Sequence, residues 1–338
     1  MAPSSVLATT LQLLRDKLVD NSYLAHPLFR AIEASGNLVK VSGGLRVEEP
    51  VIFGDHSSIT ELSNGFEPVS MAVTDPFYVA KYEFANFTQP IILSAVEKAA
   101  NKGDLAVVNI LESKMKNVML SLKREVNKQV IAGDSTKLTQ LQTLNGMGTA
   151  ALAADTTGWL EGVARASQTN TVGTLSKTTY QSKNWFNQLH DSGGTLALSH
   201  IDEVMIQAQL RSPDGSMPDI LLMSAGAFAA FQALQESRVV YNDADQSGAD
   251  ADMVGRWRGA KVYVDPNLGF ANAAADNVSI YALNSSQFRL YADVDGFFEV
   301  GDLMPVPGTA TEAAMVFNRM QLATGHLASH GVIINAEA

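Results

Sequence analysis

The stretch KAANKGDLAVVNILESKMKNVMLSLKREVNKQVI, residues 98–131, carries the longest regular apolar pattern in the chain. Its apolar residues recur at intervals of three and four, which places them along one face of an α-helix. They are Leu105, Val108, Leu111, Met115, Val118, Met119, Leu122, Val126 and Val130. The sequence AGDS that follows supplies the glycine typical of a helix end. The pattern predicts one amphipathic helix, which at about 1.5 Å per residue would be on the order of 50 Å long.

The length of this helix leaves two points open. Gly103 weakens it, because glycine costs roughly 1 kcal/mol relative to alanine, so the helix could begin on either side of that residue. A coiled-coil strand is the alternative for so long a helix. However, the apolar period is close to 3.6 residues, and the charged pairs that flank a coiled-coil seam are missing. We therefore expect a single long helix that packs into a core.

Composition and charge exclude several classes of protein. A chain of 338 residues with 46% hydrophobic content can bury a large core and is long enough for two domains. The net charge is −11 and no segment is dominated by Lys or Arg, which argues against a protein that reads nucleic-acid sequence. There are no cysteines, so disulfides and thiolate zinc sites are excluded. No apolar run could span a membrane and no secretion signal is recognisable, so we expect a cytosolic place of synthesis.

The N-terminal third predicts short helices followed by an extended arm. Residues 5–19 are expected to form a short amphipathic helix, and a second helix is expected to begin at His26-Pro27 and run to Gly36. Residues 43–90 change to a strand pattern, with one limb at 45–53, a polar tip and a returning limb. In the returning limb Tyr78, Ala80, Tyr82 and Phe84 share one face. An isolated hairpin is marginal in water, so this arm is expected to need a surface supplied from elsewhere.

Residues 165–296 mix helical and strand patterns and predict an α/β module around a central sheet. Helices are expected at 177–190 and after the capping residues Ser199 and Ser224. Strands are expected at 220–223, 260–264, 279–283 and 288–291. The tail, 297–334, is again strand-like, and its section 314–324 is expected to pair with strands near the long helix.

The chain contains no familiar catalytic motif, and three polar groups were weighed as candidate sites. Asp243-Ala-Asp245-Gln-Ser247-Gly248 matches the first half of a calcium loop, but position twelve is Val254 where a bidentate glutamate is needed, so a solvated acidic loop is preferred. His326 and His330 are four residues apart in a segment that looks like strand, and we expect surface histidines rather than a metal site.

Glu48 and Glu49 are the third group. Neighbours in a strand point to opposite faces, so these carboxylates cannot share a proton. We therefore expect no catalytic residue, no cofactor-binding residue and no metal ligand, and a protein that is not an enzyme. An α/β enzyme with an unrecognised site is the alternative that the residues leave open.

The order of the parts resembles the HK97-fold major capsid proteins of tailed bacteriophages. The similarity rests on that order and on particular stretches: residues 11–28 (LQLLRDKLVDNSYLAHPL), 43–54 (GGLRVEEPVIFG), the long helix preceded by 87–95, and 171–185 (TVGTLSKTTYQSKNW). The resemblance implies an α+β, HK97-type capsid fold. It divides the chain into an N-arm (1–42), an extended E-loop (43–90), a P-domain with the spine helix (91–160), an α/β A-domain (161–296) and a return to the P-domain (297–338).

The resemblance also implies a function and partners. The chain would assemble with itself, as hexamers and pentamers, into the icosahedral shell of a virion in the host cytoplasm, and would contact packaged double-stranded DNA non-specifically. Scaffolding, portal and decoration proteins are possible partners, and no membrane is expected. An encapsulin-like compartment shell is the alternative within the fold.

Two further expectations follow from the resemblance. Some capsid proteins of this family crosslink through a Lys and an Asn aided by a glutamate. In the segment 43–90 the only lysine is Lys81, on a strand limb and not at the tip, so no crosslink is expected. Because only about 42 residues precede the arm, we expect a separate scaffolding protein or none, and no cleavage of a large N-terminal piece.

Overall fold

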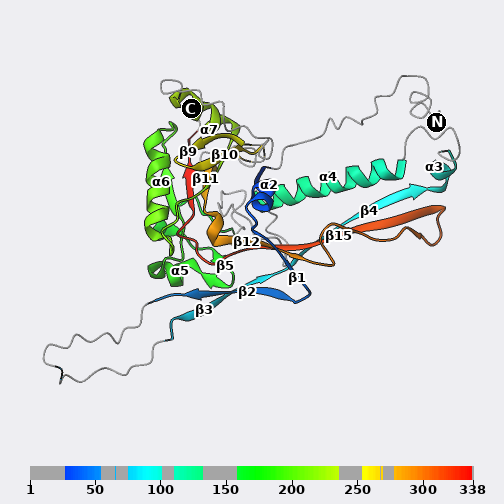
Figure 1. Cartoon of the computed structure of the whole chain (residues 1–338), viewed down its shortest axis with the longest axis horizontal. Coiled ribbons are helices and arrows are strands. Elements are labelled where there is room, and N and C mark those ends of the chain that lie inside the picture. The colour runs from blue at the N-terminus through cyan, green and yellow to red at the C-terminus, as the bar shows by residue number, and fades with distance from the viewer. Residues whose placement is uncertain are drawn as a thin grey trace.

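The computed structural model describes residues 27–54, 65, 75–100, 110–131, 158–235, 253–266, 268 and 278–336. Within them the chain forms two six-stranded sheets and two smaller hairpins, together with helices, an α+β architecture. Figure 1 shows an elongated molecule. The α/β module lies at one end, and the helix α4 (Ile110–Ile131) and the strands β4 (Ala85–Ser94) and β15 (Thr311–Thr324) extend along the long axis. The strands β2 (Arg46–Ile52) and β3 (Phe77–Glu83) form a hairpin along the lower side.

The first sheet is built from distant parts of the chain. Its strands are β1 (Leu38–Val41), β4 (Ala85–Ser94), β12 (Phe288–Asp293), β13 (Glu299–Val300), β14 (Met304–Pro305) and β15 (Thr311–Thr324). β15 is the organising strand, because it pairs antiparallel with β4, β12, β13 and β14. β4 ends directly before the helical region, so the predicted pairing of 314–324 with a strand near the long helix is confirmed.

Three helices accompany this sheet: α2 (Pro27–Ala34), α3 (Ala95–Ala100) and α4 (Ile110–Ile131). α2 begins at Pro27 as predicted, and Leu28 and Ile32 on its apolar face are buried. The described part of the predicted long helix is α4 and the end of α3. Residues 101–109, which include Gly103, lie outside the described residues.

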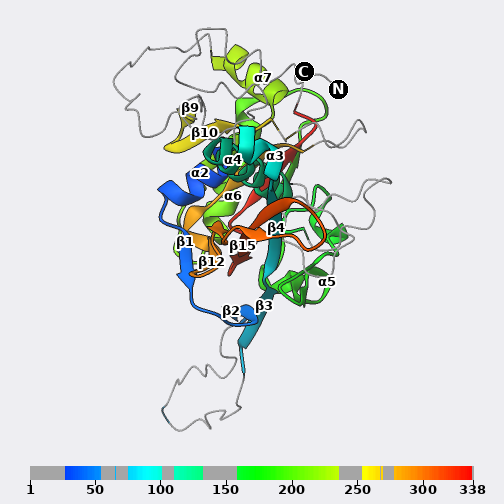
Figure 2. The same cartoon turned by 90° about the vertical axis from the view of Figure 1, so that its right-hand side faces the viewer.

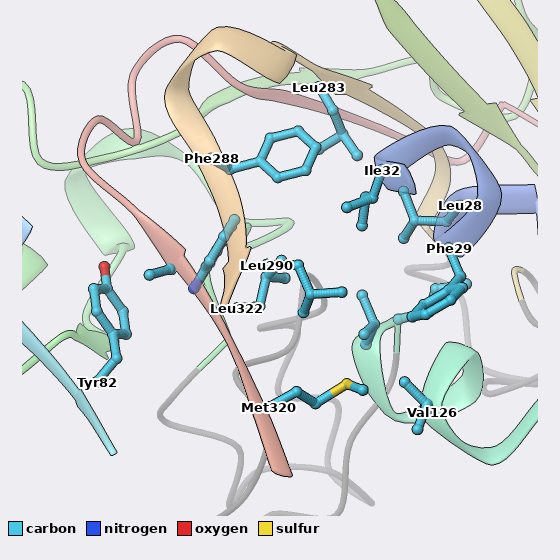
Figure 3. Packing of buried hydrophobic residues seen from close by; sticks show 14 of the residues in the cluster. Leu28, Phe29, Ile32, Tyr82, Val126, Leu283, Phe288, Leu290, Met320 and Leu322 are labelled. Atoms are coloured by element: carbon cyan, nitrogen blue, oxygen red, sulfur yellow. The ribbon is translucent and has the colours of Figure 1, made fainter. Parts of the chain in front are cut away.

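The predicted apolar stripe is the buried side of α4. Leu122, Val126 and Val130 are buried, while Lys116 and Lys128 are exposed on the other side. Figure 3 shows Val126 close to Phe29 of α2, with Leu290 of β12 and Leu322 of β15 in the same cluster. The core therefore joins the helices to the first sheet.

The second sheet forms the α/β module. Its order is β7 (Gln188–Asp191), β16 (Gly331–Ile334), β11 (Val278–Leu283), β8 (Ile220–Met223), β10 (Ala260–Val264) and β9 (Met253–Trp257). α6 (Leu198–Arg211) packs on this sheet at β7 and β16, and α7 (Ala225–Gln235) at β11. Figure 2 shows α7 and β9–β10 at the end of the molecule opposite the arm. The predicted strands at 220–223 and 260–264 are confirmed, as is the helix capped by Ser224, whose Oγ accepts from the Ala227 amide. The other predicted helix is present as α6, but Ser199 is not its cap, because the helix begins at Leu198 with Ala197 at the N-cap.

The helix predicted at 177–190 is wrong. The segment folds as α5 (Lys177–Tyr180), a 3-10 turn η2 (Gln181–Lys183) and β7. Asn184 adopts a left-handed backbone with φ +62°, which ends the helical turn. Strand β7 (Gln188–Asp191) then pairs in parallel with β16, and this long-range pairing outweighs the local helical pattern.

Sheet membership does not follow the expected domain limits at residues 90 and 296. β4 enters the first sheet at Ala85, before residue 90, because it pairs along its length with β15. The 297–338 segment supplies β15 to the first sheet and β16 to the second. The two sheets are therefore linked by one segment that contributes a strand to each of them. The five-part division remains a proposal.

The arm is a two-stranded hairpin of β2 (Arg46–Ile52) and β3 (Phe77–Glu83). Its inner face, with Val47, Val51, Ala80 and Tyr82, is buried against its own chain. The surface that the arm was expected to need is thus supplied, for this face, by another part of the same chain. The contact depends on Gly173, in the turn between β5 (Thr171–Val172) and β6 (Leu175–Ser176).

Gly173 has a backbone that only glycine adopts easily, with φ +57°. A Cβ at this position would lie 2.8 Å from the Cβ of Ala80 and from Cζ of Tyr82. The Lys81 amide donates to the Gly173 carbonyl over 2.8 Å, so the arm is seated on the backbone of this turn.

Candidate functional site

The outer face of the arm carries large apolar side chains in contact with solvent. Ile52 is 66% exposed, Phe77 68% and Val79 39%. Ile52 lies opposite Phe77 and Pro50 lies opposite Val79, so the four side chains share one face of the hairpin. An exposed apolar group of this kind on an extended hairpin indicates a surface that is covered by another molecule. We call these four residues the arm patch.

On the same face of the hairpin, charged residues lie next to the arm patch on the side away from the tip. Glu48 lies opposite Lys81, and Arg46 lies opposite Glu83. Arg46 Nε and Glu48 Oε1 form an ion pair of 2.7 Å. The outer face is therefore apolar toward the tip and polar at the base, and Figure 1 shows β2 and β3 along the lower side of the molecule.

Sequence reasoning found the arm but missed its patch. The signal was present, because Phe77 and Val79 alternate in phase with Lys81 and Glu83, the side assigned to solvent. Apolar residues at solvent positions of a half-buried strand indicate a contact surface. The pattern cannot say what covers it.

Aromatic side chains fix the tip side of the described hairpin, around Phe53 and Tyr78, on the α/β module. The Phe53 ring stacks on Tyr180 with centroids 4.8 Å apart, and lies 5.2 Å from Tyr78 and 5.4 Å from Trp185. The Trp185 indole is fully buried and donates to the Leu175 carbonyl over 3.1 Å. These contacts hold the direction in which the arm leaves the body.

A second exposed apolar surface lies on the first sheet. Ile92 of β4 is 54% exposed and Met315 of β15 is 64% exposed, and Phe317 and Met304 are exposed beside them. The alternate side chains of β15, among them Val316, are buried in the core, so the exposed set lies on the face turned away from it. We call Ile92, Met304, Met315 and Phe317 the sheet patch.

The body also contains a buried polar network around Lys177. Lys177 Nζ lies 2.9 Å from Glu161 Oε2 and donates to Asn187 Oδ1 over 3.0 Å. Burial lowers the pKa of Lys177 to about 8, and the Glu161 carboxylate opposes this shift. Glu161 also accepts from the amides of Thr169 and Asn170. Because these charges are fully hydrogen-bonded, the network joins loops of the module and is not assigned a reaction.

The structure changes the interpretation of the two histidines. His326 and His330 lie in the turn between β15 and β16, not in a strand. His330 is fully buried and its Nδ1 accepts from the Asn284 amide over 3.1 Å. Burial lowers the pKa of His330 to about 3 and that of His326 to about 4. The expectation of surface histidines is therefore wrong for His330, which the turn packs into the core, while His326 is half-buried.

The paired glutamates behave as predicted. Glu48 lies on the outer face with Arg46, while Glu49 lies on the inner face and accepts from the Tyr291 hydroxyl. The Asp243–Gly248 loop lies outside the described residues. In the part of the chain that the structure describes, no three His, Asp or Glu side chains are grouped closely enough to hold a metal ion. Among those same residues no helix is long and apolar enough to cross a membrane.

Comparison with known proteins gives the fold. Neither a model of a known family nor a curated protein matches the chain. Among solved structures, the capsid of cyanophage A-1(L) superposes with a TM-score of 0.65 at 11% identity, covering 96% of this chain and 97% of that one. The capsid of an empty GTA particle gives 0.61 at 12% identity, covering 99% and 98%.

An encapsulin is similar over the same length. The SrpI encapsulin of Synechococcus elongatus PCC 7942 gives a TM-score of 0.59 at 14% identity, covering 100% of this chain and 97% of that one. Shells of both kinds thus share the architecture described above. The predicted α+β, HK97-type fold is confirmed.

Proposed function

We propose that the chain is the major capsid protein of a tailed bacteriophage, a structural protein whose copies assemble into the icosahedral shell around the genome. The observation that carries the proposal is the arm patch on a chain with this fold. Burying one such side chain fully contributes roughly 1.5–3 kcal/mol. In a closed shell each contact is repeated by symmetry, so a small patch on every copy becomes a large total.

The arm patch and the sheet patch both consist of exposed apolar side chains, so each can cover the other. The arm patch of one copy would cover the sheet patch of a neighbour, which removes both from water. In the five-part division, the E-loop (43–90) would then reach over the P-domain (91–160 and 297–338) of the next copy. The N-arm (1–42) and the A-domain (161–296) would complete the contacts within hexamers and pentamers.

The remaining partners follow from charge and from the role of a shell. Lys116 and Lys128 are exposed on α4, and their charges suit non-specific contact with packaged DNA. Separate scaffolding, portal and decoration proteins are proposed as further partners. The shell would assemble in the cytoplasm of the host, and the role proposed for the chain is structural and not enzymatic.

An encapsulin-like compartment shell is the second candidate. It is supported by the similarity to SrpI over the whole chain. The two candidates differ in their cargo, because a virion contains DNA and a compartment encloses protein. Particles purified from their native source should therefore contain nuclease-protected DNA if the first proposal is right, and a protein cargo without DNA if the second is right.

Assembly itself is tested with the arm patch. The unaltered protein should elute as megadalton material and give rings, sheets or closed particles in electron microscopy. Phe77→Asp should keep its fold, since the side chain is exposed, but should lose particles because a carboxylate cannot be buried against the neighbour. Lys81→Gln, on the same strand and face, is the matched control and should assemble. An unaltered chain that stays a compact monomer contradicts the proposal.

A further inference from the structure

We propose that a basic face of the α/β module, made of Arg165, Lys183 and Arg211, binds the carboxylates of Glu299 and Asp302 on a second copy of the chain. This inference rests on the proposed function, because it names a contact between copies. It concerns charged groups that border the two apolar patches, since Lys183 lies beside the arm and Glu299 lies opposite Phe317 of the sheet patch.

Two guanidinium groups lie against Phe186. The Arg165 carbon Cζ is 3.9 Å from the ring centroid, and that of Arg211 is 5.1 Å away. Arg165 comes from the 3-10 turn η1 (Arg165–Ser167), and Arg211 is the last residue of α6. The ring itself is buried, so the two cations cover it and leave their charges outward.

Arg165 is held in this place by backbone contacts. Its Nη2 donates to the Gln181 carbonyl over 3.2 Å, and the Gln181 side chain donates back to the Arg165 carbonyl. Lys183 follows two residues later, and its Nζ lies 5.4 Å from the centroid of the Tyr78 ring of the arm. The basic face therefore begins beside the arm and continues to the end of α6.

These cations lack acidic partners. Within the described residues no carboxylate lies within ion-pair distance of Arg165, Lys183 or Arg211. Burial and the neighbouring Arg211 lower the pKa of Arg165, the effect expected of like charges held together. Two guanidinium groups stacked on one ring repel each other, and a bound anion removes that repulsion. Guanidinium forks match carboxylate geometry well.

Glu299 and Asp302 offer such carboxylates on the first sheet, away from the α/β module that carries the basic face. Glu299 lies in β13, an edge strand of the first sheet that is paired on one side with β15. Both side chains are exposed, and no ion pair to either is formed by the described residues. A ring of copies needs two different surfaces that fit each other, one on each side of every subunit.

The chemistry favours a second copy over nucleic acid as the source of the anion. The chain carries 35 acidic and 24 basic residues, so a neighbouring copy presents mainly carboxylates. Packaged DNA would offer phosphates to the same groups. That alternative is an outcome that the experiment separates.

The test reverses charges on one surface and then on both. Arg165→Glu/Arg211→Glu should reduce particle yield roughly tenfold or more in the full chain, measured by size exclusion and electron microscopy. Adding Glu299→Arg/Asp302→Arg to the same chain should restore particles, because both surfaces then have reversed charges and still attract each other. Lys116→Glu/Lys128→Glu, an equal charge change on α4, is the control. In the absence of DNA it should form empty particles in the same yield as the unaltered protein.

Each outcome decides the inference. If unaltered protein forms particles and the Arg165/Arg211 variant forms as many, the basic face is not an interface. If the four-residue variant remains folded by circular dichroism but does not assemble, Glu299 and Asp302 are not the partner. If empty particles form normally and only DNA retention is lost, the anion is phosphate. Arg165→Gln/Arg211→Gln, which avoids new repulsion, should show a smaller loss and keeps the test valid if a reversal prevents folding. Absence of particles from unaltered protein would instead contradict the proposed function.

Discussion

His330 is a titratable side chain enclosed by aromatic rings, with Trp159 stacked at 6.2 Å and Phe288 at 5.9 Å between centroids. It is neutral in the folded protein down to a pKa of about 3, whereas an exposed histidine titrates near 6.5. Between these values the unfolded chain binds more protons than the folded chain. The stability contribution is therefore complete above pH 6.5 and is lost as the pH falls toward the folded pKa.

The effect of His330 is large enough to measure. At pH 5 protonation of the unfolded chain costs about 2 kcal/mol of stability for this residue alone, and His326 acts in the same direction. His330→Asn, which keeps an acceptor for the Asn284 amide, should be less stable at pH 7.5 because ring packing is lost. Its stability should fall less between pH 7.5 and pH 5. Urea midpoints at the two values measure this, and equal losses in both proteins would contradict it.

Lys177 shows what a buried charge requires. Lys177→Met should destabilise the protein by about 3–5 kcal/mol, because the Glu161 carboxylate stays buried without its cation. Adding Glu161→Gln should recover part of that loss, since the amide can still accept from a backbone donor. Urea unfolding of the two single variants and the double variant gives the coupling energy. If the losses of unfolding free energy in the two single variants simply add in the double variant, Lys177 and Glu161 are not energetically coupled.

At the scale of elements, α4 separates buried from exposed positions within two turns. Leu122→Asp places a carboxylate where the side chain is 4% exposed, and should cost several kcal/mol and prevent folding. Lys116→Asp, on the solvent side of the same helix, should change stability by less than about 1 kcal/mol. Soluble yield and thermal unfolding distinguish the two. Equal damage would show that the buried face is misassigned.

Another element-scale feature is the seat of the arm. The inner face of β2–β3 rests on the turn at Gly173, while the outer face is left to solvent. One face of the hairpin is thus covered by its own chain, and the other face is exposed. Local alternation predicted the two faces and assigned the one with Lys81 and Glu83 to solvent, while the tertiary structure showed that the β5–β6 turn covers the other.

At the scale of the whole molecule, the two apolar patches should act as one interface. Met315→Asp in the sheet patch should leave the fold intact and reduce assembly, as Phe77→Asp does in the arm patch. If the patches meet between copies, the double variant should assemble little worse than either single variant, because the same contact is already broken. Particle yield against protein concentration measures this. Losses that add fully would indicate that the patches serve separate contacts.

The α4 stripe, the arm and several module elements could be predicted from the sequence because their signals are local. Leu122, Val126 and Val130 repeat at helical spacing, and the alternation from Tyr78 to Phe84 marks a strand whichever partner it meets. The order of these elements was enough to predict the HK97-type fold. It also led to the expectation of a chain without a catalytic site.

The tertiary structure decided the contacts between distant residues. β7 became a strand because β16 pairs with it, although its own residues fit a helix. His330 is buried because the turn after β15 folds inward, and Arg165 meets Arg211 across one ring through the packing of η1 against α6. Periodicity reports which face of an element is apolar, while pairing and burial depend on partners far away in the chain. The arm patch, the sheet patch and the basic face therefore emerged only from the folded chain.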